Sequence, residues 1–203
     1  MSDLDLPSSP AALRNRGLIL DVLKTVLPPH GRALEVASGT GEHVTAFAEG
    51  LPGVQWRPTE RNAEALGWIE ARRAAAGLAN LLAPAALDVL DPQAWPLERF
   101  DAVVAINLIH IAPWAAARGL VEGAASVLGF GGKLVLYGPY READRPLAES
   151  NAAFDADLKA RDPSWGLRDR EAVEALAAAS GFVRALRVEM PANNLTLVFD
   201  KRL

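Results

Sequence analysis

The chain has 203 residues, half of them apolar, so it is long enough to form one globular α/β domain with a sizeable core. A formal net charge of −4 and the lack of any basic run argue against a general nucleic-acid-binding surface. The sequence has no cysteine, which excludes disulfides, thiolate metal ligands and cysteine nucleophiles. It shows no signal-peptide pattern and no apolar stretch near the roughly 18 residues of a membrane span, so we expect a cytoplasmic protein.

The first predicted element is a leading helix over about residues 9–27. Ser9 and Pro10 supply a serine cap and a proline in the first turn. Because this helix precedes the alternation of strands and helices, we expect it to pack over the mouth of the fold and to bring Arg14 and Asn15 near a ligand. The alternative is that both residues belong to a solvated polar face.

Residues 32–43, with the sequence RALEVASGTGEH, read as a strand, a tight turn and the start of a helix. Gly39 and Gly41 let the backbone take positive φ and bring bare N–H groups close to a ligand at the helix N-terminus. Two cofactor classes use such a turn, and a turn without any ligand is the third possibility.

A dinucleotide-binding loop would need a third glycine three residues after Gly41, where this chain has Val44. An acidic residue at the head of the loop also suits a cation and would repel a pyrophosphate. The loop instead looks like that of class I methyltransferases, which bind S-adenosylmethionine (SAM), a cofactor with an ammonium, a sulfonium and no phosphate. The pattern that carries this likeness is Glu35-x-Ala37-x-Gly39-x-Gly41.

Acidic residues also fall at the ends of the next two predicted strands. Residues 54–60 read as the second strand, and Glu60 at its end is placed to accept hydrogen bonds from two ribose hydroxyls. Its alternatives are a helix cap or a partner for Arg61. A short third strand is expected to end at residues 87–90, where Asp88 could reach an adenine amino group. An ordinary turn aspartate explains Asp88 nearly as well.

Residues 101–107 are the clearest buried strand, because they are apolar without alternation. The next segment leaves the carboxyl end of this strand beside the place where the parallel order should reverse, and open α/β sheets bind ligands in that crevice. His110 can be neutral and basic near pH 7, and Trp114 offers a π face. Either could instead be structural, with the histidine capping the strand end and the tryptophan filling the core.

After a fifth strand at residues 133–137, a polar, lid-like insertion is expected at about residues 141–168. Residues 182–190 and 195–201 read as the last two strands, whose short connection makes an antiparallel hairpin. The predicted fold class is therefore α/β, with one class I methyltransferase domain over residues 1–203. We expect a Rossmann-like doubly wound sheet of seven strands, mostly parallel, with the antiparallel hairpin at its C-terminal end.

Seven stretches of the chain resemble the methyltransferase-like 26 group, a class I methyltransferase-like family long classed as a domain of unknown function. They are Ser9-Pro10 with Arg14-Asn15, residues 34–43, residues 107–111 with Pro113-Trp114, and residues 137–140, 150–155, 161–166 and 190–195. The resemblance implies the fold and SAM binding and carries no substrate. One departure is Ala112, where the family pattern has a serine before Pro-Trp, so a hydroxyl contact there is not carried over.

The leading hypothesis is a SAM-dependent methyltransferase that acts on a small polar molecule. Methyl transfer from a sulfonium is an in-line displacement, so alignment and exclusion of water can supply much of the rate enhancement. His110 is the candidate base or orienting group, with Asn107 and Tyr140 beside it. The expected cofactor contacts are Arg14, Asn15, Glu35, Ala37, Ser38, Gly39, Gly41, His43, Glu60, Asp88 and Asn107. The expected acceptor contacts are Trp114, Tyr140, Asn151, Phe154, Trp165 and Asn194.

Two other hypotheses stay open. One is a SAM-binding or ligand-free interaction module without catalysis, because fold does not imply function. The other is an NAD-dependent oxidoreductase, which Glu60 favours but Val44 and the C-terminal hairpin oppose. We expect no metal, a small-molecule substrate, no general nucleic-acid or membrane partner, and a monomer or homodimer.

Overall fold

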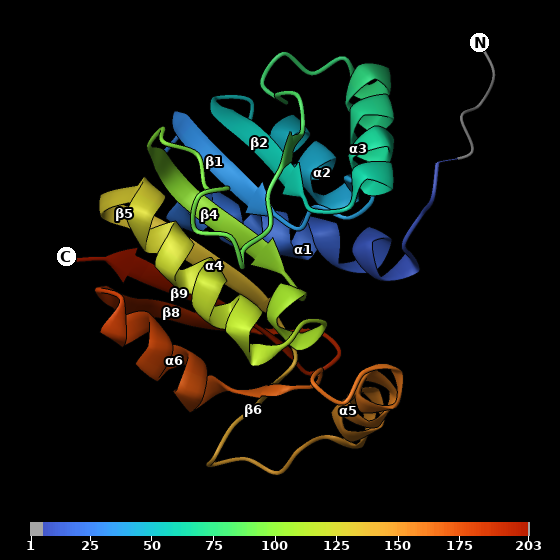
Figure 1. The fold of residues 1–203 in the computed structure, drawn as a ribbon, viewed down its shortest axis with the longest axis vertical. Helices are drawn as coiled ribbons and strands as arrows, with labels where there is room; N and C mark the ends of the chain where they lie inside the picture. Colours follow the sequence, from blue (N-terminus) through green and yellow to red (C-terminus); the bar gives the residue numbers. More distant parts are fainter. Residues whose placement is uncertain (1–5, 203) are drawn as a thin grey trace.

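The computed structural model describes residues 6–202. Its centre is a seven-stranded sheet of order β3-β2-β1-β4-β5-β9-β8, in which β9 runs antiparallel to both neighbours and the other pairs are parallel (Figure 1). The strands are β1 (Gly31–Val36), β2 (Val54–Glu60), β3 (Ala85–Ala86), β4 (Phe100–Ile106), β5 (Leu128–Gly138), β8 (Phe182–Met190) and β9 (Asn194–Lys201). A separate small parallel pair joins β6 (Tyr140–Arg141) to β7 (Arg168–Asp169).

Helices cover both faces of this sheet (Figure 1). Apolar side chains of α1 and α2 pack into the core on one face, and those of α4 and α6 pack into the core on the other. The helices are α1 (Pro10–Val26), α2 (Glu42–Gly50), α3 (Ala63–Ala76), α4 (Trp114–Val127), α5 (Glu149–Arg161) and α6 (Arg170–Ala179), with a 3-10 turn at Leu108–His110. Within residues 6–202, none of these helices combines the length and the apolar character that a membrane crossing needs.

Neighbouring residues of the central strands enter different cores. In β4, Val103 belongs to the core beneath α4 and α6, whereas Ala102 and Val104 belong to the core beneath α1 and α2. Both faces of the strand are therefore buried, which explains why its sequence is apolar without alternation. The predicted buried strand at residues 101–107 is confirmed as β4.

The leading helix and the C-terminal hairpin are also confirmed. The Ser9 hydroxyl caps α1 by accepting a hydrogen bond from the N–H of Ala12 (3.3 Å). Strands β8 and β9 pair antiparallel through a turn in which Ala192 and Asn193 have φ of 57° and 56°.

The third strand is shorter than expected. It comprises only two residues, Ala85 and Ala86, and the predicted end at residues 87–90 was wrong. The chain turns there because Oδ1 of Asp88 accepts a hydrogen bond from the N–H of Leu90 (2.9 Å), and the Asp88 carbonyl accepts one from Asp91 (3.0 Å). Asp88 is thus held in this turn, and it lies beside Glu60 at the end of β2 on the wall of one cavity.

The expected lid-like insertion contains regular structure in the form of α5. The buried side of this helix carries Asn151 and Asp155 beside Leu158. Asp155 accepts hydrogen bonds from the Lys159 ammonium (2.6 Å) and from the N–H of Leu167 (2.8 Å). Because polar side chains with distant partners hold the helix in place, the periodicity of apolar residues does not reveal it.

We predict that Gly123→Ala lowers the free energy of unfolding by about 1–3 kcal/mol, the usual cost of overpacking. A Cβ at this position of α4 would overlap the buried indole of Trp95. Urea unfolding followed by circular dichroism measures the change. The control is Gly67→Ala in α3, where the added Cβ has open space and should leave stability equal or raise it by about 0.5–1 kcal/mol. Equal stability of the two variants would contradict the tight packing of α4 on Trp95.

Candidate functional site

The loop between β1 and α2 has left-handed backbone at three alternate positions. Ala37, Gly39 and Gly41 have φ of 58°, 57° and 80°. This conformation costs a residue with a side chain about 1–2 kcal/mol, so Ala37 is a strained position. Apart from Gly39 and its two chain neighbours, no residue of the described part of the chain has an atom within 4 Å of the place that a Cβ would take at Gly39. The loop therefore borders open space on its Gly39 side.

Glu35 stands at the head of this loop with its carboxyl group buried. The residue is 1% exposed, and neither carboxyl oxygen has a hydrogen-bond partner among the described residues. Burial raises the pKa of Glu35 to about 8; the Ser38 side chain opposes the rise, and the charge of Glu60 adds to it. A buried polar group without a partner is unfavourable. Glu35 thus has two unused acceptor oxygens that are sealed from solvent.

Glu60 is fixed at the carboxyl end of β2 by three backbone N–H groups. Its Oε2 accepts a hydrogen bond from Gly39 (3.1 Å), and its Oε1 accepts from Arg61 (2.9 Å) and Asn62 (3.2 Å). The cap of α3 is Asn62, whose side chain accepts hydrogen bonds from the first turn of that helix. Glu60 therefore ties the loop to β2, and its carboxylate keeps lone pairs for further donors.

A cavity of about 180 Å³, here named the crevice cavity, lies at the carboxyl ends of β1 and β2, next to the point where the parallel order reverses. Glu60 and Asp88 are its acidic groups, and most of the other lining side chains are apolar. Such a slot suits a flat apolar ring that carries hydroxyl or amino donors. The lining residues are Val36, Ala37, Glu60, Arg61, Leu87, Asp88, Val89, Leu90, Leu108, Ile111, Ala112, Pro113, Ala116 and Trp165.

A second cavity of about 250 Å³, the strand-end cavity, lies between α1, the ends of β4 and β5, and α5. Asn15 reaches it from α1, and the Asn15 Oδ1 lies 2.7 Å from Nε2 of His43. Burial lowers the pKa of His43 to about 4, so this imidazole is neutral near pH 7. The lining residues are Ala11, Asn15, Asn107, Tyr137, Pro139, Ser150, Asn151, Phe154, Ala192 and Asn194.

The segment before α1 is tied to the loop by Glu42 and Arg72. The Glu42 carboxylate accepts hydrogen bonds from the Ser8 hydroxyl (2.9 Å), the Ser9 N–H (2.8 Å) and the Thr40 hydroxyl (3.1 Å). Burial alone would raise the pKa of Glu42, but these hydrogen bonds hold it below its usual range. Arg72 donates to the Thr40 carbonyl (2.9 Å). The contacts of Glu42 with Ser8 and Ser9, and that of Arg72 with Thr40, join residues more than 30 positions apart, and no sequence pattern indicated them.

His110 and Tyr140 form a buried edge-to-face pair, with ring centroids 4.9 Å apart and planes at 81°. Neither imidazole nitrogen of His110, nor the Tyr140 hydroxyl, has a hydrogen-bond partner within residues 6–202. Burial lowers the pKa of His110 to about 3, and the charge of Arg168 adds to this shift. A Cβ at Gly138 would overlap the imidazole, so only glycine fits beside it. His110 lines neither the crevice cavity nor the strand-end cavity.

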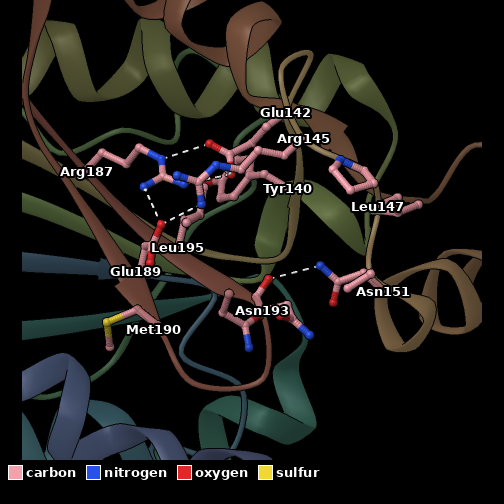
Figure 2. A pocket seen from close by; sticks show the side chains of 13 residues that line it. Tyr140, Glu142, Arg145, Leu147, Asn151, Arg187, Glu189, Met190, Asn193 and Leu195 are labelled. Carbon is pink, nitrogen blue, oxygen red and sulfur yellow. Dashed lines mark hydrogen bonds and ion pairs between the residues drawn. The ribbon is translucent and has the colours of Figure 1, made fainter.

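A third cavity of about 350 Å³, the hairpin cavity, lies between the β8–β9 hairpin, β6 and the start of α5 (Figure 2). It shares Asn151 and Asn194 with the strand-end cavity. Two arginines and two glutamates meet on its wall, namely Arg145, Arg187, Glu142 and Glu189. Neither these residues nor Tyr137 was expected from the sequence, and the only available signal was the position of Tyr137 at the end of a predicted strand.

Most of the expected residues lie in the loop or around these cavities, but four lie elsewhere than expected. His110, the expected base or orienting group, is fully buried and lines none of the three cavities. Arg14 is exposed on α1 and lines none of the three cavities. Trp114 is half-buried beneath the guanidinium of Arg168, 5.8 Å from the ring centroid. Trp165, expected on the acceptor side, lines the crevice cavity, because the N–H of Gly166 donates to the His110 carbonyl (2.9 Å) and holds that segment over the crevice.

Residues 6–201 match a family described as "Protein of unknown function (DUF938)". The chain belongs to this family. The match takes in the glycine loop, the insertion with α5 and the C-terminal hairpin, so the family covers all the elements that build the three cavities.

Solved structures of methyltransferases have the same fold. An O-methyltransferase family protein from Burkholderia thailandensis has a TM-score of 0.81 and 15% identity over 95% of this chain and 57% of its own. The SAM-dependent methyltransferase SibL, in its apo form, has a TM-score of 0.79 and 19% identity over 95% of this chain and 56% of its own. This chain thus spans little more than half of either protein. The YcgJ protein from Bacillus subtilis has a TM-score of 0.73 and 16% identity over 94% of this chain and 99% of its own.

The predicted fold class is confirmed. The sheet has seven strands, mostly parallel, with an antiparallel C-terminal pair, as in the methyltransferase Rossmann-like structures to which the chain is similar.

We predict that the parent protein loses stability as the pH rises and that Glu35→Gln removes this loss. The folded-state pKa of about 8 exceeds the ordinary value of 4.5, so between these values the folded protein holds a proton that the unfolded chain has released. The proton bound by folded Glu35 stabilises the folded state. This stabilisation is fully present below pH 4.5 and is lost as pH rises through 8, where the free energy of unfolding falls by up to about 1.4 kcal/mol per pH unit. Urea unfolding of both proteins at several values from pH 5.5 to 8.5 should show a difference that grows with pH.

The matched control is Glu49→Gln, which changes an exposed glutamate of α2. The free energy of unfolding of this variant, plotted against pH, should run parallel to that of the parent protein. Parallel curves for Glu35→Gln as well would mean that Glu35 is solvated or paired.

Proposed function

We propose that this chain is a SAM-dependent methyltransferase that acts on a small polar molecule. The observation that carries the proposal is the left-handed loop of Ala37, Gly39 and Gly41 with the buried, unpartnered carboxyl group of Glu35 at its head. This arrangement offers bare backbone and an acid to a cationic ligand, and Val44 stands where a pyrophosphate-binding loop would have its third glycine. When bound, SAM supplies a methyl group on a positively charged sulfur.

The residues of the loop and of two cavities fit that cofactor. Glu35 would face its ammonium group, and Glu60 would accept hydrogen bonds from the ribose hydroxyls at the edge of the crevice cavity. Asp88 would accept from the adenine amino group, whose ring would lie among the apolar residues of that cavity. The remaining proposed contacts are Asn15, Ala37, Ser38, Gly39, Gly41, His43 and Asn107.

The acceptor would enter the strand-end cavity, which lies between α1 and α5. Asn107, Asn151 and Asn194 give this cavity amide groups that can orient a polar nucleophile, and Phe154 can shield it from water. Asn107 itself has a left-handed φ of 58° at the end of β4. This strained position at the mouth of the sheet supports a role for its side chain in placing the acceptor.

Two further findings support the proposal. The chain is similar in fold to an O-methyltransferase family protein and to a SAM-dependent methyltransferase. The stretches that resemble the methyltransferase-like 26 group include the loop and the segment after β4, which border the crevice and strand-end cavities. Both findings favour methyl transfer over a dinucleotide-dependent reaction, and neither specifies the acceptor.

We predict that Gly39→Val abolishes SAM binding in a calorimetric titration of a protein that still folds. A β-branched side chain is strained at φ of 57°, and it would fill the open space beside the loop. Gly77→Val is a matched control, because Gly77 also has a positive φ of 63° and open space, but lies at the end of α3. That variant should lose stability and keep parental affinity for SAM.

The same titration separates the proposal from its alternatives. Parental SAM affinity in Gly39→Val would show that the loop does not hold the cofactor. Binding of NAD in place of SAM would favour an oxidoreductase. SAM binding without release of S-adenosylhomocysteine during incubation with a metabolite extract would indicate a module without catalysis.

For His110 we propose an orienting role that acts through the packing of the segment after β4, because the ring lines neither the crevice cavity nor the strand-end cavity, rather than the role of a base. Its buried ring and low pKa support this choice, because an imidazole with a pKa of about 3 is a weak base. His110→Phe should leave SAM affinity near the parental value and lower methyl transfer in the extract by less than the roughly 10²-fold loss expected for removal of a base. The exposed His30 supplies the control His30→Phe, which should change neither quantity. A larger loss, together with disappearance of an acidic limb from the pH-rate profile, would instead make His110 the base.

A further inference from the structure

The hairpin cavity contains an arginine whose guanidinium is held rigidly by a mostly buried acid (Figure 2). Arg187 donates from Nε and Nη2 to the two oxygens of Glu142, at 2.8 and 2.7 Å. Hydrogen bonds from Arg187 hold the pKa of Glu142 below its usual range, with the charges of Arg187, Arg170 and Arg145 adding to the effect. A bidentate pair of this kind fixes the plane of the guanidinium. It leaves Nη1 of Arg187 as the nitrogen that faces another partner.

That other partner is Glu189, a carboxylate that is mostly in solvent. Its side chain is 64% exposed, and it accepts hydrogen bonds from Nη1 of Arg145 (2.6 Å) and Nη1 of Arg187 (3.3 Å). The Arg145 side chain is itself 53% exposed. An exposed ion pair contributes little to stability, so the bond between Glu189 and Arg145 can open at small cost. The two guanidinium groups therefore form a carboxylate site whose present occupant is easily displaced.

The rest of the cavity suits a small molecule with an apolar body. Leu147, Met190 and Leu195 line it beside Tyr140, whose buried hydroxyl has no hydrogen-bond partner among the described residues. The volume of about 350 Å³ lies within the range of small-molecule sites. Because Asn151 and Asn194 border both this cavity and the strand-end cavity, a molecule held here extends toward the proposed site of methyl transfer.

We propose that Arg145 and Arg187 bind the carboxylate group of the methyl acceptor, and that Glu189 occupies this position until the acceptor displaces it. The acceptor is then a small carboxylic acid whose nucleophilic end lies in the strand-end cavity. The identification of the bound carboxylic acid as the methyl acceptor rests on the proposed function. The carboxylate site itself does not.

The test uses four probes that differ only in the group attached to one aromatic ring: benzoate, benzamide, benzylammonium and phenyl phosphate. Each is titrated into the full chain without SAM, and binding is followed through the backbone amide signals of Asn193, Asn194 and Leu195 in nuclear magnetic resonance spectra. Benzoate should bind more tightly than the other three. Arg145→Met should weaken benzoate binding by about tenfold, the effect of losing one charge-assisted hydrogen bond.

The variant Glu189→Ala gives the sharper result, because removal of the competing carboxylate should tighten benzoate binding about threefold to tenfold. The Arg145 and Glu189 side chains are both exposed, so we expect both variants to keep the fold. Arg184→Met is the matched control on the same strand, since Arg184 pairs with Glu174 and lines none of the three cavities. It should leave benzoate affinity unchanged.

Equal affinity for benzoate and benzamide, or benzoate affinity unaffected by Arg145→Met, would overturn the proposal. Benzylammonium binding that disappears in Glu189→Ala would overturn it in favour of a cationic acceptor, and tighter binding of phenyl phosphate would overturn the choice of carboxylate. None of these titrations contains SAM. If the carboxylate site fails these tests, the conclusion from the SAM titration of Gly39→Val is unaffected. If the SAM titration fails, the four probes still test the carboxylate site.

Discussion

The candidate site depends on the way in which the end of β2 holds the loop that follows β1. The N–H of Ser38 donates to the Thr59 carbonyl (2.9 Å), and the Thr59 hydroxyl donates to the Glu35 carbonyl (2.8 Å). Glu60 then accepts from the N–H of Gly39 (3.1 Å). Two consecutive residues of β2 thus hold three loop residues and offset the cost of left-handed backbone at Ala37. The loop cannot relax into a regular turn while these hydrogen bonds persist, so its open side stays open.

Two buried glutamates near this loop have opposite environments. Glu42 is 2% exposed and has donors from Ser8, Ser9 and Thr40, which keep its pKa low. Glu35 is 1% exposed, neither carboxyl oxygen has a hydrogen-bond partner within residues 6–202, and burial raises its pKa with only the Ser38 side chain opposing the rise. The chain therefore can satisfy a buried carboxylate with its own hydrogen-bond donors, and it does so at Glu42. Its failure to do so at Glu35 is a reason to look for a partner outside the chain.

The sequence predicted those parts of the fold that depend on neighbouring residues. The buried strands, the capped leading helix and the glycine loop all carry local patterns, so their positions could be found. Helix α5 could not, because the groups that hold it are Asn151 and Asp155, whose partners lie elsewhere in the chain. The hairpin cavity escaped for the same reason, since Arg145 and Glu189 are 44 positions apart and neither belongs to a recognisable motif.

The two halves of the candidate site meet at one junction that no local pattern describes. The segment after β4 and the segment after α5 are joined by three hydrogen bonds, from Gly166 to the His110 carbonyl (2.9 Å) and from Arg168 to the carbonyls of Ile109 (2.8 Å) and Ala112 (2.6 Å). On one side of this junction lies the crevice cavity, and on the other α5 borders the strand-end and hairpin cavities. A ligand that shifts the segment after β4 must therefore move the segment that follows α5 or break these hydrogen bonds. His110 sits inside the junction, buried against Tyr140, so a neutral ring at that position keeps it intact, whereas a charged one would be buried without a partner.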